Sequence, residues 1–432
     1  MSAIEARIAA FATADRVRVY ARLVTIVIGG GYLVAVAAGI ATHGGFTDLS
    51  GAIVGADYSA FYGAGHRVIE GRADLLYDVD AESELTRALV APAPWREEVH
   101  PFVSPPYWAL AFVPLAALPY PISLAVFSAL SIAMLFLSTR MLRDAFRSLA
   151  SRGSTRTLAR AALGFFPVLL SLLNGQTSML LLACFTAFFA LLRRQRELAA
   201  GLAIGLLAVK PPLLLGPGLV ALAAGRWRVL VGIACSASAW LAVGWSVMPD
   251  AMRAYAIATP EIVELLRASE YHTWGQTSLF GLATLLLDPI SHGAATMVGW
   301  SLIALAAIAI VVMVARTPWT PGSARWDLTL AAALALGFVA SPHLFLYDTS
   351  LLVLPIAIAV ARIEREDALL DGGPVLAATF VVAVSVFVGP YLSLGVQSAM
   401  RSMGAPPMTL QLCTLAIVWL AVVLYRRSRT EV

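Results

Sequence analysis

Long apolar runs, separated by short polar breaks, are the feature that most constrains this chain. Several of them, such as 293–315, are long enough to cross a bilayer as a helix, which takes about 20 residues. Hydrophobic residues make up 59% of the 432 positions and charged residues 13%, and the mean hydropathy is +0.81. A soluble domain is nearer half apolar and a quarter charged. The chain is therefore predicted to be all-α and integral to a membrane, with one polytopic domain over 1–432.

The arginines between the apolar runs indicate an orientation. If the N-terminus is cytoplasmic, the segments on that side carry 22 of the 30 lysines and arginines, as expected from the bias of positive charge toward the cytoplasm. We expect about twelve transmembrane helices, with the N- and C-termini both cytoplasmic. The candidate spans are 23–42, 120–139, 161–173, 177–192, 198–209, 212–225, 229–247, 293–315, 327–340, 346–362, 373–390 and 408–425.

Two long segments, 43–119 and 248–292, face the periplasm or exterior in this topology. In the first, apolar and aromatic residues recur at helical spacing from Tyr58 to Ile69, which predicts an amphipathic helix at the interface. The stretch 105–119 is apolar but short and flanked by prolines. We expect it to lie at the interface, to re-enter, or to begin a long kinked helix. No cleaved leader is expected, and the first apolar run would stay as a signal anchor.

Two of the expected spans, 161–173 and 198–209, are too short to cross a bilayer at about 1.5 Å per residue. Each ends at a polar break, N-G-Q at 174–176 and K-P-P at 210–212. Irregular backbone at membrane depth is tolerated only where protein or a water-filled cavity surrounds it. The breaks therefore predict a cavity that opens toward the outer face.

Three ionisable residues near this predicted cavity are candidates for binding or chemistry. Lys210 is the only lysine among 29 arginines, and its compact charge suits a phosphate oxygen, although it could simply snorkel to the interface. His343 and Asp348 come from S-P-H-L-F-L-Y-D and are functional candidates because they adjoin membrane segments. They would not share a helix face, so only a broken turn at Pro342 would join them. Asp348 could instead be an N-cap.

Amide and aromatic side chains complete the candidate set. N-G-Q is either a tight turn in which Gly175 has a positive φ, or a place where Gln176 binds a sugar hydroxyl. Aromatic rings can stack on sugars, but they also form ordinary interfacial belts. The candidates for substrate binding are Tyr62, Tyr107, Trp108, Asn174, Gln176, His272, Trp274 and Asp348.

Asp57, in V-G-A-D-Y-S-A-F-Y, immediately precedes the aromatic residues of the amphipathic segment. An aspartate at the start of a helix is a good N-cap. A carboxylate near apolar rings at the mouth of a cavity would also suit a general base. The residues alone leave both roles open, and they also leave the role of His100 open.

Five segments, taken together and in order, resemble glycosyltransferase family 87 over roughly residues 55–350. They are D-Y-S-A-F-Y, S-P-P-Y-W-A-L-A-F-V-P-L-A-A-L-P, N-G-Q-T-S-M-L-L-L, K-P-P-L-L-L and S-P-H-L-F-L-Y-D. Each segment is a weak signal alone, but the ordered set is fairly specific. Members of this family are bacterial membrane enzymes of the GT-C class, including mannosyl- and arabinofuranosyltransferases, so the resemblance implies a GT-C fold.

The resemblance also implies an inverting transfer of a sugar, most often mannose, from a polyprenyl-phosphate donor to a lipid or glycan acceptor on the outer face. Such a reaction belongs to glycolipid biosynthesis for the cell envelope, and the resemblance, with the arginine-rich composition, implies a bacterial cytoplasmic (inner) membrane. Asp57 matches the aspartate in the first outer loop that serves this class as catalytic base. Lys210 and His343 would stabilise the departing donor phosphate. No metal, other cofactor or nucleic acid is expected, and membrane lipids would surround the protein.

Other functions stay open from the sequence. Broken helices and intramembrane polar groups also fit a lipid or solute transporter, although no internal repeat is evident. A transferase could use polyprenyl-phosphate arabinofuranose or glucose, and a non-catalytic scaffold could share the fold. The three cysteines, Cys184, Cys235 and Cys413, fit no disulfide or zinc spacing and are predicted to be small buried side chains.

Overall fold

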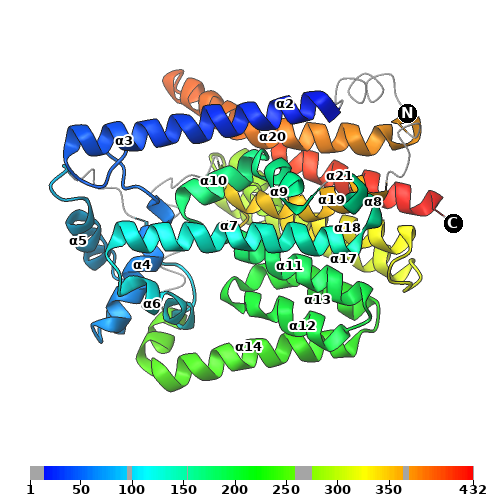
Figure 1. Ribbon diagram of the computed structural model, residues 1–432, viewed down its shortest axis with the longest axis horizontal. Coiled ribbons are helices and arrows are strands. Elements are labelled where there is room, and N and C mark those ends of the chain that lie inside the picture. Colours follow the sequence, from blue (N-terminus) through cyan, green and yellow to red (C-terminus); the bar gives the residue numbers. More distant parts are fainter. Residues whose placement is uncertain (1–13, 95–99, 153, 258–274, 363–368, 432) are drawn as a thin grey trace.

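The computed structural model describes residues 14–94, 100–152, 154–257, 275–362 and 369–431. Across these residues the chain is helical, and the only β-pairing is two isolated bridges, Thr47 with Ile53 and Gln276 with Phe345. Most helices lie roughly parallel to the long axis of the molecule (Figure 1). The all-α prediction is confirmed.

Five helical segments are long and apolar enough to cross a membrane, which supports the prediction of a membrane protein. The first, Val19–His43, is built from α2 (Ala14–Val24), a π-helical turn η1 (Thr25–Gly30) and α3 (Gly31–His43). The expected number of twelve is not confirmed. The other four segments are α7 (Tyr120–Ala145), α14 (Trp227–Val247), α17 (His292–Ala315) and residues Gly373–Ser402 of α20 (Leu369–Ser402).

The expected single helix over 161–173 is wrong. The structure has α9 (Thr155–Leu163) and α10 (Phe166–Asn174), which meet at a bend of 81°. Two features explain the bend. Phe165, the N-cap of α10, is extended and is followed by Phe166 and Pro167 in the first turn, where proline is tolerated. Gly164 touches the first helix so closely that an added Cβ would lie 2.2 Å from the Ala21 Cβ.

Shorter helices make up the rest of the bundle. The helix α18 is buried from Trp326 to Val339 and packs against α21, α19, α17 and α13, so it forms the centre of the larger hydrophobic core. The bounds are α8 (Arg147–Arg152), α11 (Ser178–Arg193), α12 (Glu197–Gly205), η4 (Leu206–Val209), η5 (Pro211–Leu214), α13 (Leu215–Ala223), α16 (Leu279–Leu287), α18 (Ala324–Val339), η7 (Leu346–Leu352), α19 (Val353–Arg362) and α21 (Leu412–Thr430).

A second, smaller core lies at the left of Figure 1 and is rich in aromatic side chains. It is built mainly by α4 (Ala56–Ile69), α5 (Val79–Val90), η3 (Pro106–Phe112) and α6 (Val113–Ala116), with η2 (Ala73–Leu75) between α4 and α5. The predicted helix from Tyr58 to Ile69 is confirmed, but its rings are buried in this core. The stretch 105–119 forms η3 and α6, which pack against α4 before α7 begins.

Glycines bring α12 and α14 into backbone contact. A Cβ added to Gly201 would lie 2.1 Å from the Val229 carbonyl oxygen, and one added to Gly232 would lie 2.5 Å from the Leu198 carbonyl oxygen. No side chain other than hydrogen fits between the two helices at these points. The pair is therefore held at the short separation that small residues permit in membrane proteins.

Charged groups gather at the helix ends opposite the aromatic core. The Asp327 side chain is fully buried at the start of α18 and accepts hydrogen bonds from the Arg362 guanidinium, while Arg193 lies 3.4 Å away. The start of α2 and the end of α21 lie at this side as well (Figure 1). Of the cysteines, Cys184 and Cys413 are buried as predicted, but Cys235 is exposed on the outward face of α14, so that part of the prediction is wrong.

A buried ion pair joins α4 to α5. Arg67 Nη1 donates to Glu82 Oε2 at 2.7 Å, and both side chains are about 5% exposed or less. Burial raises the pKa of Glu82 to about 7, and the charge of Arg67 only partly opposes this effect. The carboxyl thus holds its proton more tightly in the folded protein than in the unfolded chain. The stability that it contributes is present at low pH and is lost as the pH rises through about 7.

Glu82→Gln tests this effect because glutamine resembles the protonated carboxyl. We expect the free energy of unfolding of the variant to rise relative to that of the native protein between pH 5 and pH 8. The relative gain should be on the order of 1 kcal/mol per unit of pKa difference. Thermal unfolding in detergent at several pH values measures it. Glu84→Gln, at an exposed position of the same helix, serves as the control. An offset between Glu82→Gln and the native protein that is the same at every pH would contradict the prediction.

Candidate active site

Asp57 lies in the first turn of α4, and the start of that helix is firmly anchored. Gly55 is the N-cap, with the positive φ of +72° that glycine tolerates, so the helix begins at Ala56. Tyr120 at the start of α7 donates its hydroxyl to the carbonyl oxygens of Val54, at 2.8 Å, and Gly55, at 3.1 Å. The expectation that Asp57 is the N-cap is therefore wrong. Its carboxylate is 16% exposed and lies in a turn whose dipole favours negative charge.

The N-G-Q segment packs against this same turn. Gly175 ends α10 with a φ of +71°, which confirms the tight turn, and an added Cβ would lie 2.5 Å from the Tyr58 Cβ. Asn174 and Gln176 therefore flank a contact with the residue next to Asp57. Both side chains are partly exposed, so the amides remain candidates for binding a polar ligand.

Lys210 lies at the break between η4 and η5 and forms an ion pair with Asp348 of η7. The Lys210 Nζ lies 2.5 Å from Asp348 Oδ2, and the two side chains are 27% and 1% exposed. Asp348 also accepts from the Ser178 hydroxyl, at 3.3 Å, and from the Phe345 backbone N–H, at 3.2 Å. Asp348 is therefore not the N-cap of η7, as one interpretation of the sequence held: the N-cap is Phe345, and the Asp348 carboxylate accepts from the N–H of that residue while it also holds the lysine. The ammonium has further N–H groups on its exposed side.

His343 lies in the turn that follows α18. Its side chain is exposed at the surface, yet the protein around it desolvates the ring. This desolvation, followed by the positive charge of Lys210, lowers the pKa of His343. The imidazole is therefore favoured in its neutral form, in which one ring nitrogen donates and the other accepts a hydrogen bond. The turn at Pro342 brings both His343 and Asp348 toward Lys210.

The aromatic candidates are packed inside the protein. Tyr62 is 6% exposed and donates to the Leu118 carbonyl, and Tyr107 is 4% exposed and donates to the Ala208 carbonyl at 2.8 Å. Trp108 is buried against Phe112 and Trp240. The contacts of these three rings position η3, η4 and α4, and a role in binding substrate stays a prediction. His272 and Trp274 lie outside the described residues.

Contacts across four elements link these groups into one region. The start of α4 touches the N-G-Q turn, and α11, which begins at Ser178 just beyond that turn, bonds to Asp348 of η7 and so reaches Lys210. Sequence reasoning missed Ser178 and Tyr120, because a hydroxyl inside an apolar run has no visible partner in the sequence. It also left His100 unassigned, although His100 lies beside Asp57.

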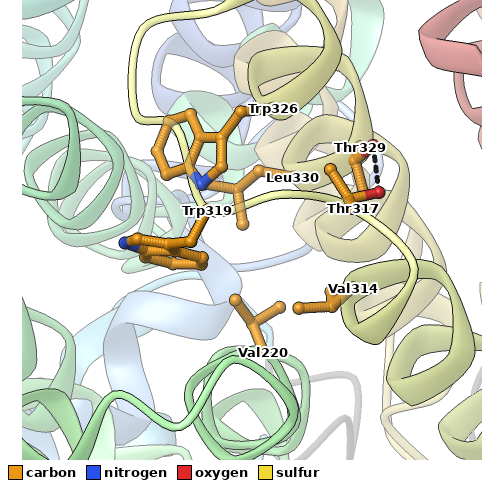
Figure 2. A pocket seen from close by; sticks show the side chains of 7 residues that line it. All are labelled: Val220, Val314, Thr317, Trp319, Trp326, Thr329 and Leu330. Atoms are coloured by element: carbon orange, nitrogen blue, oxygen red, sulfur yellow. Dashed lines mark hydrogen bonds between the residues drawn. The ribbon is translucent and has the colours of Figure 1, made fainter.

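A small cavity lies elsewhere, between the end of α17 and the start of α18 (Figure 2). Its volume is ~10 Å³, which is room for about one water molecule. It is separate from the region of Asp57 and Lys210, and its polar lining groups are confined to the hydroxyls of two threonines and the indole N–H groups of two tryptophans. The lining residues are Val220, Val314, Thr317, Trp319, Trp326, Thr329 and Leu330.

The region around Asp57 and Lys210 combines a carboxylate that can take a proton with a cation and polar groups that can hold an anion. Among the described residues, no three His, Cys, Asp or Glu side chains lie close enough together to bind a metal ion. The expectation that no metal or other cofactor is used stays a prediction. Such a set, on an apolar helical bundle, fits a membrane enzyme that transfers a group.

The comparison with protein families defines this class. The model of glycosyltransferase family 87 matches residues 102–342, more than half of the 432 residues. The protein is therefore a membrane glycosyltransferase, and it belongs to glycosyltransferase family 87. The match includes the N-G-Q turn and Lys210, whereas Asp57, His343 and Asp348 lie outside it. No curated protein and no solved structure matches the chain.

Proposed function

We propose that this protein is an inverting glycosyltransferase that moves mannose from a polyprenyl-phosphate donor to a hydroxyl group of a lipid or glycan acceptor. The reaction would take place at the outer face of a bacterial cytoplasmic membrane, with both termini in the cytoplasm. The observation that carries the proposal is the contact of the N-G-Q turn with Tyr58, the neighbour of Asp57 in the first turn of α4, together with α11, which leads from that turn to the Lys210–Asp348 pair.

In the proposed reaction the acceptor oxygen attacks the anomeric carbon of the donor. Asp57 takes the proton from the acceptor hydroxyl while the bond between the anomeric carbon and the phosphate oxygen breaks. The electron pair leaves with the phosphate, and the configuration inverts because attack and departure occur on opposite faces. General-base assistance of this kind contributes roughly 10²–10⁴-fold to a rate.

Lys210 would stabilise the charge that develops on the departing phosphate. Its ammonium is held by Asp348, and its side chain remains 27% exposed, so its other N–H groups can donate to phosphate oxygens. The neutral imidazole of His343 can add a directed hydrogen bond. Fixed donors of this kind stabilise a transition state because they need no reorganisation when charge appears.

A panel of donors tests the proposal. Purified protein in nanodiscs is mixed with a lipid extract of the host and with a radiolabelled polyprenyl phosphate carrying mannose, arabinofuranose or glucose. We expect label to move from the mannose donor to an acceptor, with an inverted anomeric configuration in the product. The corresponding nucleotide sugar, which lacks the prenyl chain, is the matched control and should give no product.

The other outcomes separate the rival functions. Transfer from arabinofuranose or glucose, but not from mannose, would keep the reaction class and change the donor. Transfer from the nucleotide sugar would overturn the lipid-linked donor. Label that crosses the membrane of a reconstituted vesicle while still attached to its original carrier would favour a transporter over the proposed transferase.

A further inference from the structure

His100 is held against the carboxylate of Asp57 by the packing of the chain that follows it. Its Nδ1 lies 3.7 Å from Asp57 Oδ1. Two residues later, the 2% exposed ring of Phe102 packs edge-on against Phe61, with the ring centres 6.4 Å apart. Asp57 and Phe61 are four residues apart on α4 and therefore share one face of that helix. The segment beginning at His100 thus runs along the face that carries Asp57.

A second contact fixes the same segment. The Tyr77 hydroxyl donates to the Ser104 carbonyl at 2.9 Å, and the Tyr77 ring packs against Phe102. The backbone just beyond His100 is consequently held by contacts that do not involve Asp57. Nδ1 is the ring atom that lies 3.7 Å from Asp57 Oδ1, so a proton on that nitrogen would be attracted by the carboxylate.

Exposure distinguishes the two partners. The His100 side chain is 7% exposed and that of Asp57 is 16% exposed, so the imidazole is the more deeply covered of the two. A group in that place is poorly situated to touch a substrate directly. It is well situated to fix the orientation of the carboxylate that does.

We propose that His100 is a positioning residue for the transfer reaction, acting by directing its Nδ1 side at Asp57 and holding that carboxylate in the orientation that accepts the proton of the acceptor hydroxyl. This inference rests on the proposed function. It goes further by adding a residue that precedes the family match and that the sequence alone left without a role.

Three substitutions separate positioning from packing. His100→Leu introduces an apolar side chain of similar size that has no N–H. His100→Asn instead places an amide nitrogen where Nδ1 lies. His100→Gln places its amide one atom further away. We expect His100→Leu to lower kcat about 10–100-fold, as small errors of alignment do, with KM for the donor little changed. His100→Asn should recover most of this loss and His100→Gln less.

Two results of these assays would overturn the inference. One is a kcat for His100→Leu equal to that of the native protein. The other is a His100→Asn enzyme that is folded by thermal unfolding but as slow as His100→Leu, because a donor at the Nδ1 position would then be of no use. A loss confined to KM would likewise count against the inference, because it would mean that His100 serves binding instead of the chemical step.

A second measurement does not depend on activity. In protein labelled with ¹⁵N-histidine and embedded in nanodiscs, the ring resonances of His100, assigned by their absence in His100→Asn, should move in Asp57→Asn. The ring signals of His292, which pairs with Asp288 at 2.7 Å, should not move and serve as an internal control. Unchanged His100 signals would overturn the pairing. If the native protein transferred no sugar from any donor, the proposed function would fail while this measurement still decided whether the two residues interact.

Discussion

Asp57→Asn is expected to lower the rate of sugar transfer by about 10²–10⁴-fold, the range that a general base contributes. The asparagine amide has nearly the same shape as the carboxylate but cannot accept the proton of the acceptor hydroxyl. Because Gly55 is the N-cap of α4 and Tyr120 anchors the residues before it, we expect the helix to stay in place. The rate is measured with the donor that the panel identifies, and folding is measured by thermal unfolding.

Asp80→Asn is the matched control. Asp80 occupies the second position of α5, as Asp57 does in α4, and its side chain is exposed. Both substitutions remove a favourable charge from the first turn of a helix, but only one of them changes the candidate site. If Asp57→Asn kept more than about a tenth of the native rate while unfolding at the native temperature, the assignment of Asp57 as the base would be wrong.

Lys210→Met is expected to have the largest effect on stability, a loss of roughly 3–5 kcal/mol. The substitution removes the counter-ion of Asp348, whose side chain is only 1% exposed. The carboxylate keeps the hydrogen bonds from Ser178 and Phe345, which do not replace a full charge. Thermal unfolding in detergent measures the loss, and it should be much larger than that of Asp348→Asn, because the lysine of that variant can reach solvent.

The double variant Lys210→Met with Asp348→Asn separates stability from catalysis. Removing both charges should restore most of the stability, since no buried charge is then unpaired. The rate of transfer should remain low, because the departing phosphate would then have no ammonium beside it and the hydrogen bond from the neutral His343 does not replace a positive charge. A double variant as active as the native protein would refute the proposed role of Lys210, and a Lys210→Met variant as stable as the native protein would show that the ion pair contributes little.

The sequence predicted the parts of the fold that follow from local chemistry. The hydropathy pattern predicted the bounds of α14 and α17, and the start of α7, to within two residues. The end of α7 was missed, because this helix continues past residue 139 through arginines to Ala145. The breaks at N-G-Q and at Lys210 were also predicted, since glycine and proline act on the backbone nearby. The bend between α9 and α10 was not, because it depends on contact between Gly164 and Ala21, far away in the sequence.

The candidate site shows the same division. Lys210, His343 and Asp348 were recognised as unusual polar residues, but their association depends on the turn at Pro342 and on the packing of η7 against α10 and α11. Tyr107 and Trp108 are candidates for stacking on a sugar, and their described contacts lie within the protein. An aromatic residue in a core and one in a binding site have the same composition, and only tertiary contacts distinguish them.

The glycine contact between α12 and α14 has a mechanical consequence. Lys210 follows α12 through the single turn η4, and the Ala208 carbonyl of that turn is held by Tyr107, whose ring stacks on Trp240 of α14. The backbone at Lys210 is thus held by α12 through η4, and by α14 through Trp240 and Tyr107. These two helices are themselves in backbone contact at their glycines. Any motion that admits or releases a large lipid beside Lys210 is expected to move α12 and α14 together as one rigid unit. The ammonium of Lys210 would move with them.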